Sequence, residues 1–110
     1  MSDILRELGR ILADRSQADP ETSYVASLYA RGLEAICRKV NEEAGEVIEA
    51  AGSGDRGAIV HEVADLWFHT LVLLSHSGLG PETVLAELER RFGRSGLDEK
   101  AARTGKPGPE

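Results

Sequence analysis

The sequence predicts an all-α protein, a helical bundle of about five helices, and three observations support that class. Apolar residues recur at spacings of three and four through most of the chain, which is the helical period. Capping residues, glycines and prolines divide this pattern into five segments. No stretch of the sequence shows the regular alternation of apolar and polar residues that half-buried strands have.

The predicted helices have residues typical of helix ends at their boundaries. Their spans are 2–14, 24–31, 33–51, 56–77 and 81–92. Residues suited to the N-cap position stand before three of them: Ser2 or Asp3, Thr22 or Ser23, and Asp55. Helix ends are expected at Gly32, Gly78 and Gly93. Pro81 is expected to begin the last helix, whose apolar residues are expected to face inward: Val84, Leu85, Leu88 and Phe92. Residues 1–95 are expected to form one domain, followed by a flexible tail, 96–110.

The composition is that of an acidic soluble protein. A net charge of −6 argues against general nucleic-acid binding, although a bound metal or local basic residues still admit an anionic ligand. The single cysteine, Cys37, excludes an intrachain disulfide, and its place beside an apolar stripe favours a buried structural thiol over a nucleophile. The N-terminus shows no secretory signal, and the apolar run Leu71–Leu74 is too short to span a bilayer. We therefore expect a cytoplasmic protein without membrane contact.

The fourth predicted helix needs cover on all sides. Apolar residues occupy nearly its whole circumference: Leu66, Trp67, Phe68, Leu71, Val72, Leu73 and Leu74. A helix of this kind is stable only where other elements cover it, and the other helices, three of them short, leave part of it bare. We therefore expect a two-fold homodimer that completes a four-helix-bundle-like core. The alternative is a monomer in which the first and fifth helices wrap the fourth.

Two pairs of acidic residues stand three positions apart on the third and fourth predicted helices. They are Glu43 with Glu46, and Glu62 with Asp65. Residues at this spacing share one side of a helix, where like charges repel. Both pairs adjoin apolar stripes, so packing of the two helices by their apolar faces would line one seam with four carboxylates. The pattern predicts a site for a hard divalent cation such as Mg²⁺; the alternative is a solvated acidic face.

The same acids lie within a recognisable motif. Residues 42–46 (Glu-Glu-Ala-Gly-Glu) and, fifteen residues later, 62–65 (Glu-Val-Ala-Asp) match the E-E-x-x-E…E-x-x-D signature of the all-α, MazG-like nucleoside-triphosphate pyrophosphatases. Within that superfamily the sequence resembles the phosphoribosyl-ATP pyrophosphatase family. The supporting stretches are 23–28, 39–43, 64–74, 85–92 and 95–101. Asn41 departs from the glycine expected before the paired glutamates, and we expect this to be neutral because a helix tolerates asparagine there.

The resemblance implies a reaction and a set of residues. Phosphoribosyl-ATP and water would give phosphoribosyl-AMP and pyrophosphate, the second step of histidine biosynthesis, with Mg²⁺ as the cofactor. The implied metal ligands are Glu43, Glu46, Glu62 and Asp65. The implied catalytic residues are Glu42, Glu43 and Glu46, with either Glu42 or Glu46 accepting the proton of the attacking water.

Five residues are expected to contact the substrate: Ser23, Tyr24, Lys39, Lys100 and Arg103. Alternatives stay open for most of them. Lys39 could equally pair with an acid, and Ser23 could be only an N-cap. Lys100 and Arg103 could be no more than part of a solvated basic tail.

The histidines carry weaker signals. His61 opens a stretch that begins like a zinc-protease helix, but Asp65 stands where the second histidine of that motif belongs. His69, one turn after Asp65, is either a hydrogen-bond donor to that carboxylate or a satisfied core histidine.

Two further functions of the protein also stay open. One is a house-cleaning pyrophosphatase for other nucleoside triphosphates, and the other is a non-catalytic helical interaction module.

Overall fold

The computed structural model describes residues 3–93, and this part of the chain is helical and contains no strand. Its helices are α1 (Ile4–Arg15), α2 (Tyr24–Arg31), α3 (Leu33–Ser53), α4 (Arg56–His76) and α5 (Pro81–Phe92). The all-α class and the five predicted helices are confirmed, and each end lies within two residues of the expected one. The tail expected at 96–110 lies outside the described residues.

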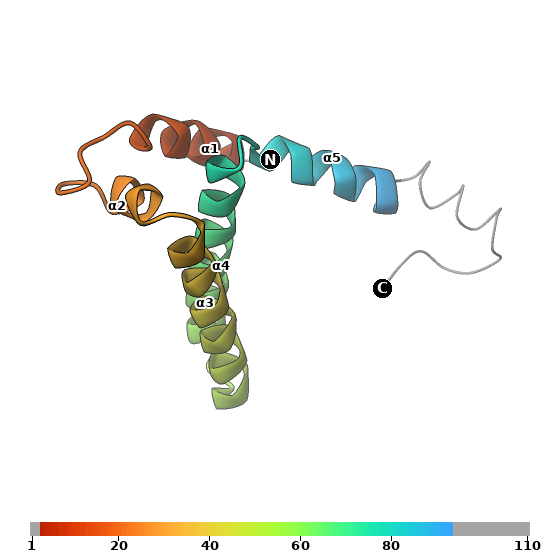
Figure 1. The fold of residues 1–110 in the computed structure, drawn as a ribbon. Coiled ribbons are helices and arrows are strands. Elements are labelled where there is room, and N and C mark those ends of the chain that lie inside the picture. Colours follow the sequence, from red (N-terminus) through yellow and green to blue (C-terminus); the bar gives the residue numbers. More distant parts are fainter. Residues whose placement is uncertain (1–2, 94–110) are drawn as a thin grey trace.

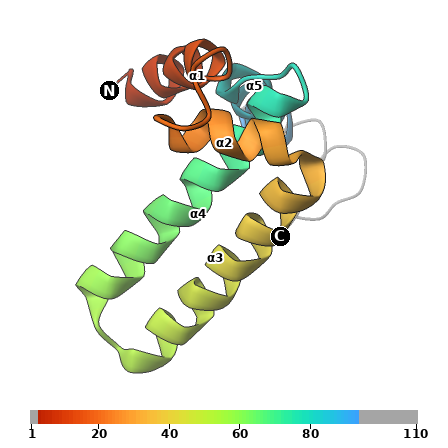
Figure 2. The same cartoon turned by 60° about the vertical axis from the view of Figure 1, so that its left-hand side comes forward.

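Helices α3 and α4 form a long antiparallel hairpin that supports the rest of the fold (Figure 1). Helices α1 and α2 lie at the end of the hairpin opposite the α3–α4 turn, and α5 leaves that end in a different direction. Figure 2 shows α3 and α4 running side by side along their length. One chain therefore contributes two long helices, which is half of the four-helix core that the sequence predicts for a dimer.

The α3–α4 turn depends on one glycine and on side-chain hydrogen bonds. Gly54 has a φ of 76°, in the left-handed region that residues with a Cβ rarely adopt. The Ser53 hydroxyl accepts a hydrogen bond from the Asp55 amide at 3.1 Å. The Asp55 carboxylate accepts one from the Ala58 amide at 3.2 Å, which caps α4 as the sequence predicts. This closure sets the register in which side chains of α3 and α4 face each other.

The core lies where four helices meet at the opposite end of the hairpin. Its largest fully buried side chains come one each from α1 to α4: Leu12, Leu28, Ile36 and Val72. Burying a side chain of this size stabilises the fold by about 1.5–3 kcal/mol. Between α2 and α3, Gly32 alone makes the change of direction, with a φ of 93°. Because of this short connection, the start of α2 is held close to α3 and α4.

Two expectations about burial are wrong for the single chain. Cys37, expected to be buried, is exposed, and the nearby Leu33 is half exposed as well, so this side of α3 lacks cover. The apolar residues of α5 were expected to face inward. Each of them is between 40% and 48% exposed, because α5 extends away from the hairpin: Val84, Leu85, Leu88 and Phe92.

Helix α4 is long and apolar enough, by length and composition alone, to cross a membrane. The short apolar run in the sequence did not indicate this. Only 17% of the apolar window of α4 is buried inside the chain. The core helix of a globular assembly meets the same criterion when other surfaces cover it, and the described residues leave most of this window of α4 uncovered.

Candidate active site

Four carboxylates from α3 and α4 converge on the hairpin, and we call them the acid cluster: Glu43, Glu46, Glu62 and Asp65. One oxygen from each of Glu43, Glu46 and Glu62 lies within 4.8 Å of the others. Ligand atoms of His61, Glu62 and Asp65 form a second group with the same spacing, so Glu62 belongs to both groups. The seam expected from helical periodicity is therefore present, and it contains all four acids.

Two carboxylate oxygens in the acid cluster are buried without a hydrogen-bond partner among the described residues. They are Oε2 of Glu43, a residue that is only 8% exposed, and Oε1 of Glu62. A buried acceptor left in this state costs about 1–3 kcal/mol, and more when it is charged. A cation bound between the helices would satisfy both oxygens, and hard divalent ions prefer such carboxylate ligands.

The electrostatics of the acid cluster also favour a cation. The pKa of Glu62 is raised above its ordinary value, mainly by desolvation and then by the negative charge of Glu46. Asp65 and Glu43 raise the pKa of Glu62 further, whereas His61 lowers it. A bound cation would remove this penalty, because it favours the ionised form of every carboxylate near it.

Lys39 supplies positive charge at the edge of the acid cluster. Its Nζ lies 3.6 Å from Oε1 of Glu42 and 3.8 Å from Oε1 of Glu43. The pKa of Lys39 is raised, first by its electrostatic interaction with Tyr24 and then by Glu42 and Glu43, against the effect of desolvation. Of the two roles left open for Lys39, pairing with an acid is the one present here. Glu42 is exposed and lies outside the two groups of converging ligand atoms.

The residues at the start of α2 have separate roles. Ser23 is buried, and its hydroxyl accepts a hydrogen bond from the Ala26 amide at 3.2 Å, which caps α2. Tyr24 is 47% exposed, and its hydroxyl lies 2.8 Å from Nε2 of His69. Nδ1 of His69 lies 2.9 Å from the backbone oxygen of Asp65. His69 is thus a satisfied buried histidine, and the alternative of a hydrogen bond to the Asp65 carboxylate is wrong.

The histidine that does contact the Asp65 carboxylate is His61. Its Nε2 lies 3.4 Å from Oδ2 of Asp65. No role for His61 is predicted from the sequence, although its spacing of four from Asp65 on a helix places the two side chains on one face. His61 completes the rim of the acid cluster on the α4 side.

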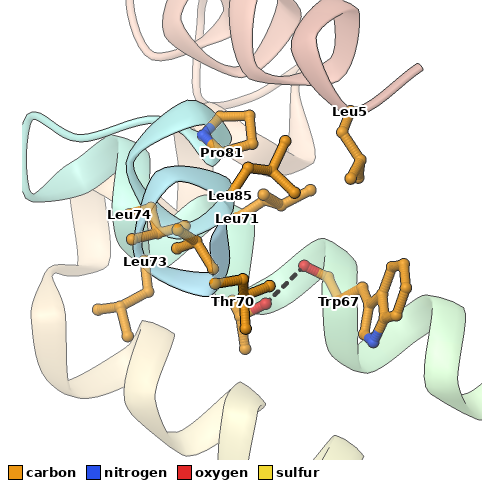
Figure 3. A pocket seen from close by; sticks show the side chains of 10 residues that line it. Leu5, Trp67, Thr70, Leu71, Leu73, Leu74, Pro81 and Leu85 are labelled. Atoms are coloured by element: carbon orange, nitrogen blue, oxygen red, sulfur yellow. Dashed lines mark hydrogen bonds between the residues drawn. The ribbon is translucent and has the colours of Figure 1, made fainter. Parts of the chain in front are cut away.

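A second concave feature lies elsewhere on the molecule, and we call it the apolar groove (Figure 3). It has a volume of about 440 Å³ between α1, α4 and α5. Its walls are almost entirely hydrocarbon: Leu5, Trp67, Thr70, Leu71, Leu73, Leu74, Pro81, Val84, Leu85 and Leu88. Thr70 donates its hydroxyl proton to the backbone oxygen of Trp67 at 2.8 Å, so it offers the groove little polarity. No member of the acid cluster lines this groove.

The arrangement of the acid cluster accords with comparisons between this chain and known proteins. Residues 5–92 match the sequence profile of the family described as phosphoribosyl-ATP pyrophosphohydrolase. The chain belongs to the phosphoribosyl-ATP pyrophosphohydrolase family. The resemblance inferred from the acidic motif is therefore confirmed.

Curated relatives support the same family. A phosphoribosyl-ATP pyrophosphatase of Methylococcus capsulatus is 56% identical over 101 residues, which is 92% of this chain and 96% of that protein. Proteins of the same name from Aromatoleum aromaticum and Azoarcus sp. are also 56% identical, over 93% and 92% of this chain and 94% of each relative. The match is thus to whole relatives of this family and not to a fragment.

The range matched to the phosphoribosyl-ATP pyrophosphohydrolase family contains the whole acid cluster, together with Tyr24 and Lys39. Two residues expected to contact the substrate, Lys100 and Arg103, lie outside that range and outside the described residues. Their roles remain predictions from the sequence.

Proposed function

We propose that this chain is a cytoplasmic, Mg²⁺-dependent hydrolase that converts phosphoribosyl-ATP and water into phosphoribosyl-AMP and pyrophosphate, the second step of histidine biosynthesis. Membership of the phosphoribosyl-ATP pyrophosphohydrolase family supports the reaction. The observation that carries the metal dependence is the convergence of four acids, in which one oxygen of Glu43 and one of Glu62 are buried without a hydrogen-bond partner within residues 3–93. Such oxygens are the ligands that Mg²⁺ prefers.

The acid cluster would hold Mg²⁺ through Glu43, Glu46, Glu62 and Asp65. When bound, Mg²⁺ neutralises phosphate oxygens and lowers the pKa of a coordinated water. His61 is a less suitable ligand for Mg²⁺, because hard ions favour oxygen over imidazole nitrogen. We assign His61 the task of orienting the Asp65 carboxylate, which it contacts at 3.4 Å.

Hydrolysis needs a proton acceptor for the attacking water, and Glu42 and Glu46 are the two candidates. Glu46 is exposed and has an oxygen in the acid cluster, whereas Glu42 pairs with Lys39 outside it. We therefore assign proton acceptance to Glu46. Water would attack a phosphorus of the anhydride between the α- and β-phosphates and Glu46 would take its proton. The bridging P–O bond would break, and the products would be phosphoribosyl-AMP and pyrophosphate.

The positive and polar groups around the cluster would bind the substrate. Lys39 can exchange an acid partner for a phosphate oxygen, because its Nζ lies 3.6 Å and 3.8 Å from the two carboxylates, distances that mark loose pairs. Tyr24 is half exposed, and its hydroxyl is linked to the cluster through His69, which bonds the backbone of Asp65. Ser23 supports this contact indirectly by capping α2. We propose that Lys100 and Arg103 close over the phosphates or the ribose.

A pyrophosphate-release assay tests this function. Phosphoribosyl-ATP, dUTP and dCTP are compared at equal concentration while Mg²⁺ is titrated from zero into the millimolar range. We expect the highest kcat/KM for phosphoribosyl-ATP and no turnover without a divalent ion. Preference for dUTP or dCTP would indicate a house-cleaning pyrophosphatase instead. A melting temperature that ignores Mg²⁺, together with no hydrolysis of any substrate, would favour a non-catalytic interaction module.

We further propose that the working molecule is a homodimer and that the apolar groove lies in its interface. The support is apolar area without cover: Trp67 is 56% exposed, and Leu85 and Leu88 on α5 are nearly half exposed. A second copy is the partner that can cover this face and complete the four-helix core at the same time. Trp67 is the only tryptophan in the sequence, so its fluorescence reports on this face. Dilution below the dissociation constant should shift its emission to the red, in step with the loss of dimer in sedimentation experiments.

A further inference from the structure

His69 is a buried side chain that hydrogen-bonds two residues of the proposed site. It is 6% exposed. Its Nδ1 lies 2.9 Å from the backbone oxygen of Asp65, and its Nε2 lies 2.8 Å from the hydroxyl of Tyr24. A carbonyl oxygen only accepts hydrogen bonds, so Nδ1 carries a proton. In the neutral ring Nε2 is then an acceptor, and Tyr24 donates its only hydroxyl proton to it.

His69 connects the hydroxyl of Tyr24 to the acid cluster, because Nδ1 of His69 also lies 4.0 Å from Oε1 of Glu43. The Tyr24 ring stands edge-on to the His69 ring, with centroids 5.8 Å apart and an interplanar angle of 87°. Tyr24 is also the main cause of the raised pKa of Lys39, whose ammonium group pairs with Glu43 of the cluster. Because the Tyr24 hydroxyl already donates its hydrogen bond to His69, its oxygen can only accept further hydrogen bonds.

The second tyrosine of α2 provides an internal comparison. The hydroxyl of Tyr29 hydrogen-bonds Oγ of Ser75, and its ring packs against that of His76 at 5.3 Å. Both tyrosines therefore tie α2 to α4. Only Tyr24 does so through a histidine that also bonds the backbone of a cluster residue. A simple attachment of α2 would not need this second contact.

We infer that His69 is a positioning residue: it holds the Tyr24 hydroxyl beside the acid cluster and accepts its hydrogen bond, so that Tyr24 meets the bound nucleotide as a hydrogen-bond acceptor. The matching groups on a nucleotide are donors, either a ribose hydroxyl or an N–H of the base. This inference rests on the proposed function, since Tyr24 would contact the substrate of that site. His69 acts through Tyr24 and does not touch the reacting atoms.

Two substitutions at His69 separate its two hydrogen bonds. In His69→Asn the amide nitrogen lies near the position of Nδ1, so the bond to the Asp65 carbonyl is kept and the one to Tyr24 is lost. In His69→Gln the amide oxygen lies near the position of Nε2, so an acceptor for Tyr24 is kept. Tyr24→Phe removes the hydroxyl itself, and Tyr29→Phe is the matched control on the same helix.

Steady-state kinetics with phosphoribosyl-ATP at saturating Mg²⁺ provide the first readout. Tyr24→Phe and His69→Asn should raise KM about three- to tenfold, the effect of one hydrogen bond, with kcat unchanged. His69→Gln should recover most of the loss seen in His69→Asn, and Tyr29→Phe should keep the wild-type KM. The double variant Tyr24→Phe/His69→Asn should be no worse than Tyr24→Phe alone. An unchanged KM in Tyr24→Phe, or additive losses in the double variant, would overturn the inference.

Nitrogen NMR of the His69 ring in the wild-type protein without metal provides a readout independent of activity. We expect one tautomer with the proton on Nδ1, and a changed Nε2 resonance in Tyr24→Phe but not in Tyr29→Phe. A ring protonated only on Nε2 would overturn the inference whatever the kinetics show. Failure of the wild-type protein to hydrolyse phosphoribosyl-ATP would instead count against the proposed function, while the NMR result would still decide the Tyr24–His69 assignment.

Discussion

Helix α4 contributes to two regions that differ in polarity, and both are incomplete in the single chain. Toward its start, Glu62 and Asp65 join acids from α3, and one oxygen each of Glu43 and Glu62 is buried with no hydrogen-bond partner in the described part of the chain. Toward its end, Trp67 and Leu74 join α1 and α5 around a groove with almost no polar wall (Figure 3). The acid cluster sets four carboxylates against one lysine at its edge, so negative charge is in excess, and the apolar groove lacks hydrocarbon cover.

The difference between the two regions indicates what each one binds. An unsatisfied buried carboxylate is costly because its charge is desolvated, so a bound cation with ordered ligands would stabilise it. An exposed apolar wall costs roughly 25 cal/mol for each Å² left in water, so a large complementary surface that buries it would stabilise it. Because the two needs are physically independent, substitutions should separate metal-dependent activity from assembly.

The largest effect is expected from a substitution in the acid cluster. Glu43→Gln removes a charged ligand while keeping the shape of the side chain, and we expect kcat/KM for phosphoribosyl-ATP to fall at least about 100-fold, because loss of even a supporting partner of a metal ligand often costs 10–100-fold. Asp65→Asn should behave in the same way. The matched control is Glu49→Gln, an exposed acid on α3 outside the cluster. Initial rates of pyrophosphate release measure the loss.

The same variants should fold at least as well as the wild type when no metal is present. Removal of one negative charge relieves repulsion within the acid cluster, so thermal unfolding in EDTA should occur at an equal or higher temperature. Added Mg²⁺ should raise the melting temperature of the wild type and of Glu49→Gln, but raise that of Glu43→Gln much less. Wild-type turnover in Glu43→Gln or in Asp65→Asn would remove the metal-site assignment.

Effects of intermediate size are expected from substitutions in the core and in the apolar groove, which should differ in how they depend on protein concentration. Ile36→Ala deletes a fully buried side chain, so it should cost about 2–5 kcal/mol of unfolding free energy at any protein concentration. Leu85→Asp alters a half-exposed side chain of the groove, so it should matter only where dimer forms. Urea unfolding at low and high protein concentration, with sedimentation on each sample, separates the two. A Leu85→Asp protein that remains dimeric would place the interface elsewhere.

The sequence predicts the helices and the acidic seam better than it predicts what covers them. Helical period and end signals such as Gly54 and Asp55 are local, so the five spans follow from short stretches of chain. Spacing also indicates that Glu43 and Glu62 share a seam, since each lies at the edge of an apolar stripe. Cys37 and Leu85 were misplaced because burial depends on which surface packs over a stripe, and periodicity alone does not specify that surface.

The Tyr24–His69 contact could not be predicted from the sequence, for a related reason. The two residues are 45 positions apart, and the hydrogen bond between them depends on the turn that Gly32 makes between α2 and α3. The sequence pointed to His69 only through its distance of one turn from Asp65. That spacing does place the two residues together, but the bond formed is to the backbone and not to the carboxylate.

The smallest effect expected is a pH dependence that belongs to the acid cluster alone. The pKa of Glu62 is raised above the 4.5 of the unfolded chain, mainly by desolvation, so the folded protein binds a proton at Glu62 more tightly than the unfolded chain does. The contribution of Glu62 to stability is therefore most favourable below pH 4.5 and is lost as the pH rises through the raised pKa. In EDTA, the stability of Glu62→Gln relative to the wild type should grow with pH across this window and then become constant.

Urea unfolding at closely spaced pH values measures this difference. Taking the difference between the two proteins removes the titration of the groups that do not interact with Glu62, so the remaining pH dependence belongs to Glu62 and to the acid-cluster groups that interact with it. Saturating Mg²⁺ should reverse the order of the two proteins near neutral pH, because the ion stabilises the ionised carboxylate of the wild type. A difference in unfolding free energy between the two proteins that is constant with pH and unaffected by Mg²⁺ would mean that Glu62 is an ordinary solvated acid. The acid cluster would then no longer be a metal-binding region that contrasts with the apolar groove.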